Sequence, residues 1–285
     1  MWPRMRLRPL LTFLAALGLM LGFAVAQVHA APSAQAASGE RILSFAADYN
    51  LASDGSMGVT ETLVWQFGPG EHHGIKRSIT VRQGVSSPAG KYRLYEISGV
   101  GASSPTGANS EVSVSELGAD EVIRIGSPTA PFQGEQQQTY VVKYRLAHVA
   151  NGFPDHAELF WNVTGGRFDI PIDSVKVSVH GPAAVTNALC FQGADRSANP
   201  CKASSGSVAT YSAAGLGPRD QVTIVASFPL SAFTSTAPDL RDGDTGFSGA
   251  DPGHSVSPSV PNALSLFGFG GGLALPLLPF GCMGP

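Results

Sequence analysis

The chain has 285 residues, of which 43% are apolar and only 14% are charged, and its formal net charge is −3. Ordinary globular domains carry about 25% charged residues. The 34 glycines and 21 prolines disfavour a long helical bundle or a coiled coil, because both residues destabilise helix interiors. The slightly negative charge disfavours a basic nucleic-acid-binding protein, so no nucleic-acid partner is expected.

Residues 1–36 have the three parts of a secretory signal peptide, and a signal helix is expected there. Several arginines precede an uncharged apolar stretch at residues 10–26, and small residues follow it. Cleavage after Ala30 and cleavage after Ala36 both fit this pattern. An uncleaved membrane anchor is the alternative, because the apolar stretch is close to the shortest length that spans a bilayer. The sequence therefore predicts a protein that is secreted or bound to the outer face of the cell membrane.

Residues 37–231 are expected to form a single all-β domain, an antiparallel β-sandwich. Apolar and polar residues alternate along many short segments that are separated by turn-forming residues. The first two segments flank an Asp54-Gly55 turn, which is typical of a β-hairpin. The predicted strands are 42–51, 59–67, 92–100, 111–117, 121–125, 139–146, 157–163, 172–179, 207–211 and 221–228.

The composition changes after the predicted sandwich. Residues 232–262 are rich in Ser, Pro, Gly and Asp and are expected to form a disordered, flexible linker. Residues 263–285 form an apolar tail that resembles the remnant of a membrane segment. Glycines and prolines interrupt this tail and no basic residue follows it, so a stable spanning helix is not expected. Whether the tail anchors the chain or marks a truncation is left open.

The cysteines agree with an oxidising compartment outside the cytoplasm. Cys190 and Cys201 flank a short, turn-rich segment and are expected to form a disulfide. Cys282 is expected to be free. The segment between Cys190 and Cys201 holds no further Cys or His, which disfavours a metal site there.

Arg77 and Trp161 are the two residues for which a fully solvent-exposed position fits the sequence least well. Arg77 lies between two isoleucines two residues away on either side, so its side chain is expected to run along apolar surface toward an acid. A buried Arg needs a partner, and Glu158 and Glu61 are the candidates. Trp161 has an N–H that needs an acceptor when buried. Arg77, Glu158 and Trp161 therefore form a candidate patch, with a structural role favoured over a ligand site.

Metal binding and hydrolysis find little support in the sequence. His72 and His73 are adjacent, and adjacent strand residues point to opposite faces. His156, with Asp155 and Glu158 nearby, is read as part of a solvated loop. No nucleophile elbow, zinc-protease helix or phosphate-binding loop is present in the sequence. We therefore expect no catalytic residue, no metal and no cofactor. Acids available to a hydrolase would be Glu61, Glu71, Asp155, Glu158 and Asp169.

An ordered set of motifs carries a resemblance to one protein family. The motifs are Asp54–Thr62, His73–Ile79, Ile123–Gly126, Gly134, Thr139-Tyr140, Glu158–Gly165, Pro171-Ile172, Cys190, Gly193 and Cys201. In this order and spacing they resemble the extracytoplasmic domain of the YciQ-like predicted bacterial membrane proteins, a domain of unknown function (2207), and the resemblance covers about residues 40–228. It implies a signal peptide, a β-rich outer domain and a membrane anchor, and it implies no activity or catalytic residue.

The sequence thus favours a non-enzymatic binding or interaction module of the cell envelope. Its partner would be an envelope protein or a glycan, and an association with the membrane stays open. The alternative is an extracytoplasmic hydrolase that acts on cell-wall or polysaccharide material. Two converging carboxylates in a cleft would favour the hydrolase, and a flat or aromatic surface would favour binding.

Overall fold

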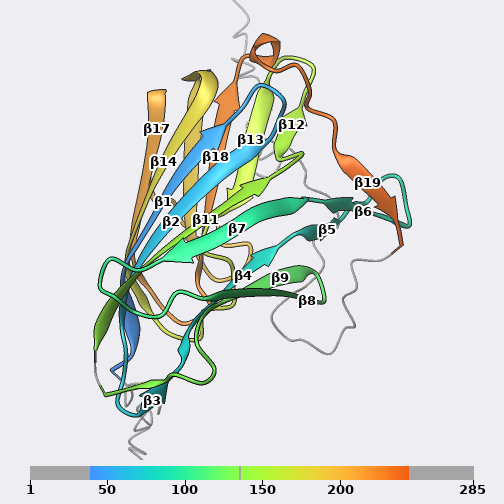
Figure 1. Ribbon diagram of the computed structural model, residues 1–285. Helices are drawn as coiled ribbons and strands as arrows, with labels where there is room; N and C mark the ends of the chain where they lie inside the picture. Colours follow the sequence, from blue (N-terminus) through green and yellow to red (C-terminus); the bar gives the residue numbers. More distant parts are fainter. Residues whose placement is uncertain (1–38, 135, 244–285) are drawn as a thin grey trace, which may run out of the picture. The chain divides into compact units, whose positions relative to one another are not determined.

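The computed structural model describes residues 39–134 and 136–243. The predicted signal peptide, the linker beyond residue 243, the apolar tail and Cys282 lie outside the described residues. Strands are the main regular structure of the described residues, where they form five sheets, and no α-helix is present there (Figure 1). The predicted all-β class is confirmed. No helix in this part of the chain is long and apolar enough to cross a membrane.

The largest sheet has seven strands. Its strands, in spatial order, are β16 (Lys202–Ser204), β17 (Gly206–Leu216), β14 (Ile172–Val185), β1 (Arg41–Leu51), β2 (Met57–Gln66), β11 (Gln137–Leu146) and β7 (Ile97–Ser103). Neighbours are antiparallel except β1 and β14, which pair in parallel with Tyr49 opposite Val179. This one parallel pair departs from the expected antiparallel sandwich. β1 and β14 are far apart in sequence, so no tight hairpin sets their relative direction.

Two smaller sheets pack against the seven-stranded sheet. Their strands are, in one, β12 (Ala150–Gly152), β13 (Ala157–Asn162), β18 (Gln221–Phe228) and β15 (Asn187–Gly193), and in the other, β4 (Gly74–Thr80), β9 (Asp120–Gly126) and β8 (Val112–Leu117). The packing is close where Phe228 of β18 lies over β14, because a Cβ at Gly181 would come within 2.1 Å of the Phe228 ring. The buried core fills the space between the sheets.

Alternation along the strands decides which side chains enter this core. Every second residue of β2, from Met57 to Trp65, is buried, and the residues between them are half-buried. The predicted hairpin is present, since β1 and β2 pair antiparallel around the Asp54-Gly55 turn. One charged residue, Glu61, falls on the buried side of β2.

The end of the described chain differs from the predicted flexible linker. Residues 233–243 return along the domain instead of leaving it, and Thr234 donates a backbone hydrogen bond to Ser53. The strand β19 (Asp239–Asp242) pairs with β6 (Lys91–Leu94), which also pairs with β5 (Arg82–Gly84). The edge of β6 has backbone N–H and C=O groups that need hydrogen-bond partners, and the backbone of residues 239–242 supplies them. This pairing orders the segment although its polar side chains bury little apolar surface.

Several strands were not predicted from the sequence. The short strands β3 (Glu71–His72) and β10 (Phe132–Gln133) pair with each other. β4 was missed because Arg77 stands at an inward-facing position and interrupts the apolar alternation. The predicted strand at residues 92–100 is divided between β6 and β7, which join different sheets. Cys190 of β15 and Cys201 form a disulfide, with their sulfur atoms 1.94 Å apart.

Candidate functional site

Arg77 lies on the buried face of β4 and forms an ion pair inside the domain. Its Nε lies 2.7 Å from Oε2 of Glu61, and a terminal guanidinium nitrogen lies 2.8 Å from Oε1. Both side chains are almost completely buried. Glu61 was one of the two acids expected as the partner of Arg77, and Glu158 was the other. The structure pairs Arg77 with Glu61.

The remaining donors of Arg77 are also satisfied. The guanidinium donates to the backbone oxygens of Ser78, Val163 and Thr164 at 2.7–3.1 Å. Tyr144 donates its hydroxyl to Oε1 of Glu61 at 2.7 Å. Because every N–H of the guanidinium is used within the protein, Arg77 has no donor left for a ligand. This arrangement supports a structural role for the pair.

Aromatic rings and charge hold Arg77 protonated in the core. The guanidinium carbon lies 5.5 Å from the ring centre of Phe45 and 5.9 Å from that of Phe168. Burial by itself lowers the pKa of Arg77, but the charge and hydrogen bonds of Glu61 outweigh burial and raise this pKa. Burial, followed by the negative charge of Glu61, raises the pKa of Tyr144 well above its ordinary value.

Glu158 and Trp161 do not share a surface with each other. Both are on β13, three positions apart, and therefore point to opposite faces of the sheet. Trp161 lies on the core side with its ring edge-on to Tyr95, at 5.4 Å between ring centres. The structure thus separates Glu158 from the other two members of the predicted patch, because Arg77 and Trp161 are both buried in the core and both act on Tyr49.

Glu158 is a buried acid with little compensation. Neither carboxylate oxygen has a hydrogen-bond partner among the described residues, and Nε2 of His156 lies 3.8 Å from Oε2. Ser227, opposite Glu158 on β18, also has a buried hydroxyl without such a partner. Burial raises the pKa of Glu158, and His156 partly opposes this rise.

The histidines considered as metal ligands are occupied by other contacts. His72 contacts the backbone oxygen of Gly68 at 2.8 Å, and His73 contacts that of Ser127 at 3.1 Å. His156 contacts Asp155 at 2.7 Å. Across residues 39–134 and 136–243, no group of three or more His, Cys, Asp or Glu side chains is arranged to hold a metal.

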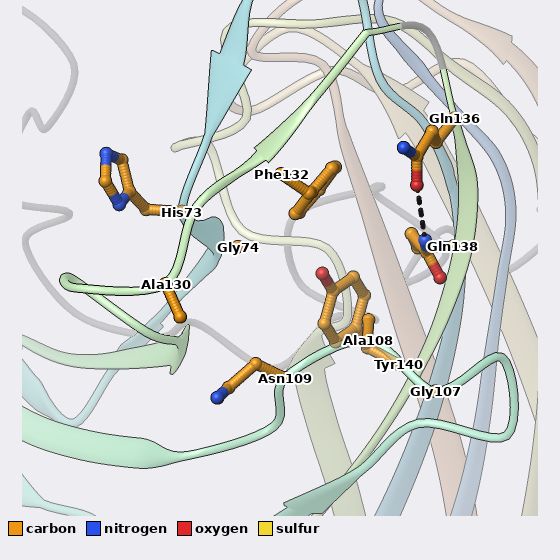
Figure 2. Close-up of a pocket in the computed structure, with 10 residues that line it drawn as sticks. All are labelled: His73, Gly74, Gly107, Ala108, Asn109, Ala130, Phe132, Gln136, Gln138 and Tyr140. Carbon is orange, nitrogen blue, oxygen red and sulfur yellow. Dashed lines mark hydrogen bonds between the residues drawn. The ribbon is translucent and has the colours of Figure 1, made fainter.

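A pocket of about 230 Å³ opens beside β10 and β11 and was not predicted from the sequence (Figure 2). Four segments distant in sequence build it: the junction of β3 and β4, the turn before β8, the segment leading into β10, and the start of β11. Its lining residues are His73, Gly74, Gly107, Ala108, Asn109, Ala130, Phe132, Gln136, Gln138 and Tyr140.

Tyr140 forms the floor of this pocket. The side chain is buried, and its hydroxyl has no hydrogen-bond partner among the described residues. Figure 2 shows the hydroxyl oxygen turned into the pocket on the side of Phe132. Burial raises the pKa of Tyr140 to about 12, so the hydroxyl keeps its proton at neutral pH and can donate a hydrogen bond. A buried polar group without a partner costs free energy unless a ligand or water satisfies it.

Side-chain amides form one wall of the pocket. Gln138 donates to Oε1 of Gln136 at 3.0 Å, the bond drawn in Figure 2, and accepts a bond from Thr106 at 2.6 Å. Oδ1 of Asn109 accepts the backbone N–H of Glu111, which leaves the Asn109 amide N–H groups available. Phe132 is held by an edge-on contact with Phe67, at 4.9 Å between ring centres. The pocket therefore combines oriented neutral donors with an aromatic side.

Close backbone contact shapes the entrance at Gly74. A Cβ at Gly74 would lie 2.0 Å from the backbone oxygen of Ile125, and the φ angle of Gly74 is +119°. Only glycine fits this position, where β4 begins against β9.

One feature of the sequence could have indicated the amide wall of the pocket. Residues 136–138 are a polar run that comes directly before the predicted alternating strand.

Comparison with known proteins identifies the family. The model of the N-terminal domain of predicted membrane proteins, DUF2207, matches residues 41–228. The chain belongs to the DUF2207 family. The match covers β1 to β18 and ends before η2 (Leu230–Ala232) and β19. No curated protein matches the chain. The disulfide is consistent with a location outside the cytoplasm.

Solved structures resemble this DUF2207 chain only distantly. Native yeast LTA4 hydrolase is 6% identical with a TM-score of 0.39, and the match covers 66% of this chain and 29% of that one. A putative protease from Parabacteroides distasonis is 9% identical with a TM-score of 0.35, covering 66% and 40%. An aminopeptidase N family protein from Idiomarina loihiensis is 14% identical with a TM-score of 0.32, covering 64% and 29%. This chain thus spans less than half the length of these proteins, and the likeness supports no inference about activity.

Proposed function

We propose that this chain is a non-enzymatic binding module of the cell envelope, on the outer side of the membrane, and that the pocket around Tyr140 is its ligand site. The single observation that carries the proposal is the buried Tyr140 hydroxyl, which points into a pocket and has no partner within the described protein. The disulfide and the family description support the location.

The chemistry of the pocket favours a neutral, polar ligand. Its walls offer amides from Asn109 and Gln138, a phenol donor from Tyr140 and the ring of Phe132. Hydroxyl and acetamido groups of a sugar match such donors and acceptors, and the apolar face of a sugar ring packs on an aromatic side chain. Sites for drug-sized ligands have volumes of about 300–1,000 Å³, so this smaller pocket suits a single sugar unit of an envelope glycan.

The positions of the acids favour binding over hydrolysis. Glu61 is bonded to Arg77, and Asp169 lies 2.7 Å from Arg219. No carboxylate of the described residues lines the Tyr140 pocket. A glycoside hydrolase needs two carboxylates on opposite sides of the scissile bond. The pocket therefore supports recognition of a glycan without its cleavage.

Titration of the purified full-length chain with the disaccharide of N-acetylglucosamine, followed by calorimetry and ligand-observed NMR, tests the proposal. Tyr140→Phe removes only the hydroxyl and is expected to weaken binding about fivefold to tenfold, the effect of one lost hydrogen bond. Tyr92→Phe is the matched control, because Tyr92 lies on β6 and does not line the pocket.

Equal affinity of the wild type and Tyr140→Phe for the disaccharide would contradict the assignment of the pocket. Release of new reducing ends during incubation with cell-wall glycan would contradict the non-enzymatic function and favour the hydrolase. Retained binding in Tyr92→Phe together with loss in Tyr140→Phe would support the proposal.

A further inference from the structure

A second hollow lies on the opposite face of the seven-stranded sheet from the core, across β16, β17 and β14. It has a volume of about 420 Å³. Residues paired across these strands share one face of the sheet. Lys202 is opposite Ser212, and Ser212 is opposite Lys176. The next row on the same face consists of Ser204, Thr210 and Ser178. Two lysines and four hydroxyl groups therefore line one hollow.

The two lysines lack the partners that most basic residues of this protein have. Neither Lys176 nor Lys202 forms an ion pair or a side-chain hydrogen bond within the described residues, and both are exposed. By contrast, Arg41 lies 2.7 Å from Asp173 and Arg219 lies 2.7 Å from Asp169. Two positive charges without nearby acids, placed two strands apart, both attract an anion that lies between them.

Acids do not balance this charge. No carboxylate of the described residues lines the hollow. The nearest acid on the adjacent strand of the same face is Asp48, which is opposite Ser178. Asp48 is engaged elsewhere, since it accepts a hydrogen bond from Asn50 and lies 3.1 Å from Nε2 of His180. The hollow is therefore positive in a chain whose net charge is negative.

The disulfide holds one side of this hollow in place. Lys202 directly follows Cys201, which is bonded to Cys190 of β15 in the facing sheet. The backbone N–H of Cys201 also donates to the oxygen of Cys190 at 2.9 Å. The three-residue strand β16 is thus attached at its start, which fixes Lys202 two strands from Lys176.

We propose that the hollow between Lys176 and Lys202 binds a phosphate group. Lysine ammonium groups bind phosphate as point charges, and the hydroxyls of Ser178, Ser204, Thr210 and Ser212 can donate to its remaining oxygens. The phosphate is that of a lipid headgroup or of a soluble phosphate ester, and both present the same oxygens. This site is separate from the Tyr140 pocket and does not depend on the function proposed for that pocket.

The test measures binding of the full-length chain to inorganic phosphate by calorimetry in chloride buffer, and to vesicles with and without phosphatidylglycerol by flotation. Lys176→Glu and Lys202→Glu are each expected to weaken binding at least about fivefold, the effect of one lysine near an anionic surface. Lys143→Glu is the matched control, since Lys143 is exposed on the same face of the sheet but on β11, outside the hollow. Circular dichroism checks that all three variants fold.

Binding of free phosphate supports a soluble ester as the source, and binding only to phosphatidylglycerol vesicles supports a lipid headgroup. Reduction of the disulfide is expected to weaken whichever of these two kinds of binding is observed. Added salt is also expected to weaken binding to phosphate and to the vesicles. An equal loss in Lys143→Glu would show attraction to net charge and would overturn the site. Absence of binding to both probes would also overturn it, without bearing on the Tyr140 pocket.

Discussion

Arg77 of β4 and Glu61 of β2 join two sheets through the core by paired hydrogen bonds of 2.7 and 2.8 Å. A buried ion pair contributes little net stability when complete, because both charges lose their hydration, but removal of one partner leaves the other uncompensated. The pair therefore matters most as a constraint on which strands face each other.

Glu61→Gln is expected to destabilise the domain strongly. The substitution leaves the Arg77 charge buried without a counter-ion, which costs about 3–5 kcal/mol. Urea unfolding followed by tryptophan fluorescence measures the loss. Glu116→Gln is the control, because Glu116 pairs with Arg82 on the exposed surface and such pairs contribute at most about 1 kcal/mol. Similar losses in the two variants would contradict the role of the buried pair.

Two tyrosines on β11 allow a matched comparison. The Tyr144 hydroxyl donates to Oε1 of Glu61, the partner of Arg77 in the buried ion pair, and Tyr144→Phe is expected to lower the free energy of unfolding by about 1.5–3 kcal/mol. Tyr140→Phe removes a hydroxyl without a partner among the described residues, so stability is expected to stay equal or rise. Urea midpoints of the two variants decide this, and a larger loss in Tyr140→Phe would show that its hydroxyl is bonded in the free protein.

Glu158 is expected to make the stability depend on pH. Burial raises its pKa above the ordinary value of 4.5, so the folded state holds this proton to higher pH than the unfolded state does. The associated stability is present below the unfolded pKa and is lost as the pH rises through the folded pKa. Glu158→Gln removes this loss, so the variant should be more stable than the wild type at neutral pH and no more stable near about pH 4.

Urea midpoints of the wild type and Glu158→Gln across this pH range measure the effect. The difference between the two proteins isolates Glu158 from acids such as Asp54, whose pKa is lowered by hydrogen bonds to Ser56. Glu111→Gln, at an exposed position, is the control. A constant difference at all pH values would show that the burial of Glu158 has no consequence for its ionisation.

The disulfide is expected to stabilise the domain by about 3 kcal/mol, because it closes a short loop in the unfolded chain. Alkylation of the unreduced, denatured protein followed by peptide mass mapping should label Cys282 and neither Cys190 nor Cys201. Label on both Cys190 and Cys201 would contradict the pairing. The unfolding midpoint with and without reductant then measures the contribution of the bridge.

The pocket around Tyr140 could not be predicted from the sequence. Tyr140 stands in an alternating strand and was correctly assigned to β-structure, but its hydroxyl faces residues from the turn at 107–109 and from β10. Those segments come together only through pairing of distant strands. The alternation of apolar residues specifies a buried face and carries no information about which polar atoms on that face find partners.

The sequence by itself determined the β class, the first hairpin and the need of Arg77 for a buried acid, because these follow from local alternation, turn residues and the cost of burying a charge. Only the tertiary structure decided that Glu61 is that acid and that Glu158 points the other way from Trp161. The choice depends on strand register and on which sheets face each other. Strand register and the facing of sheets are set by contacts between segments distant in sequence. Local sequence leaves Glu61 and Glu158 equivalent as partners of Arg77, and these contacts decide between them.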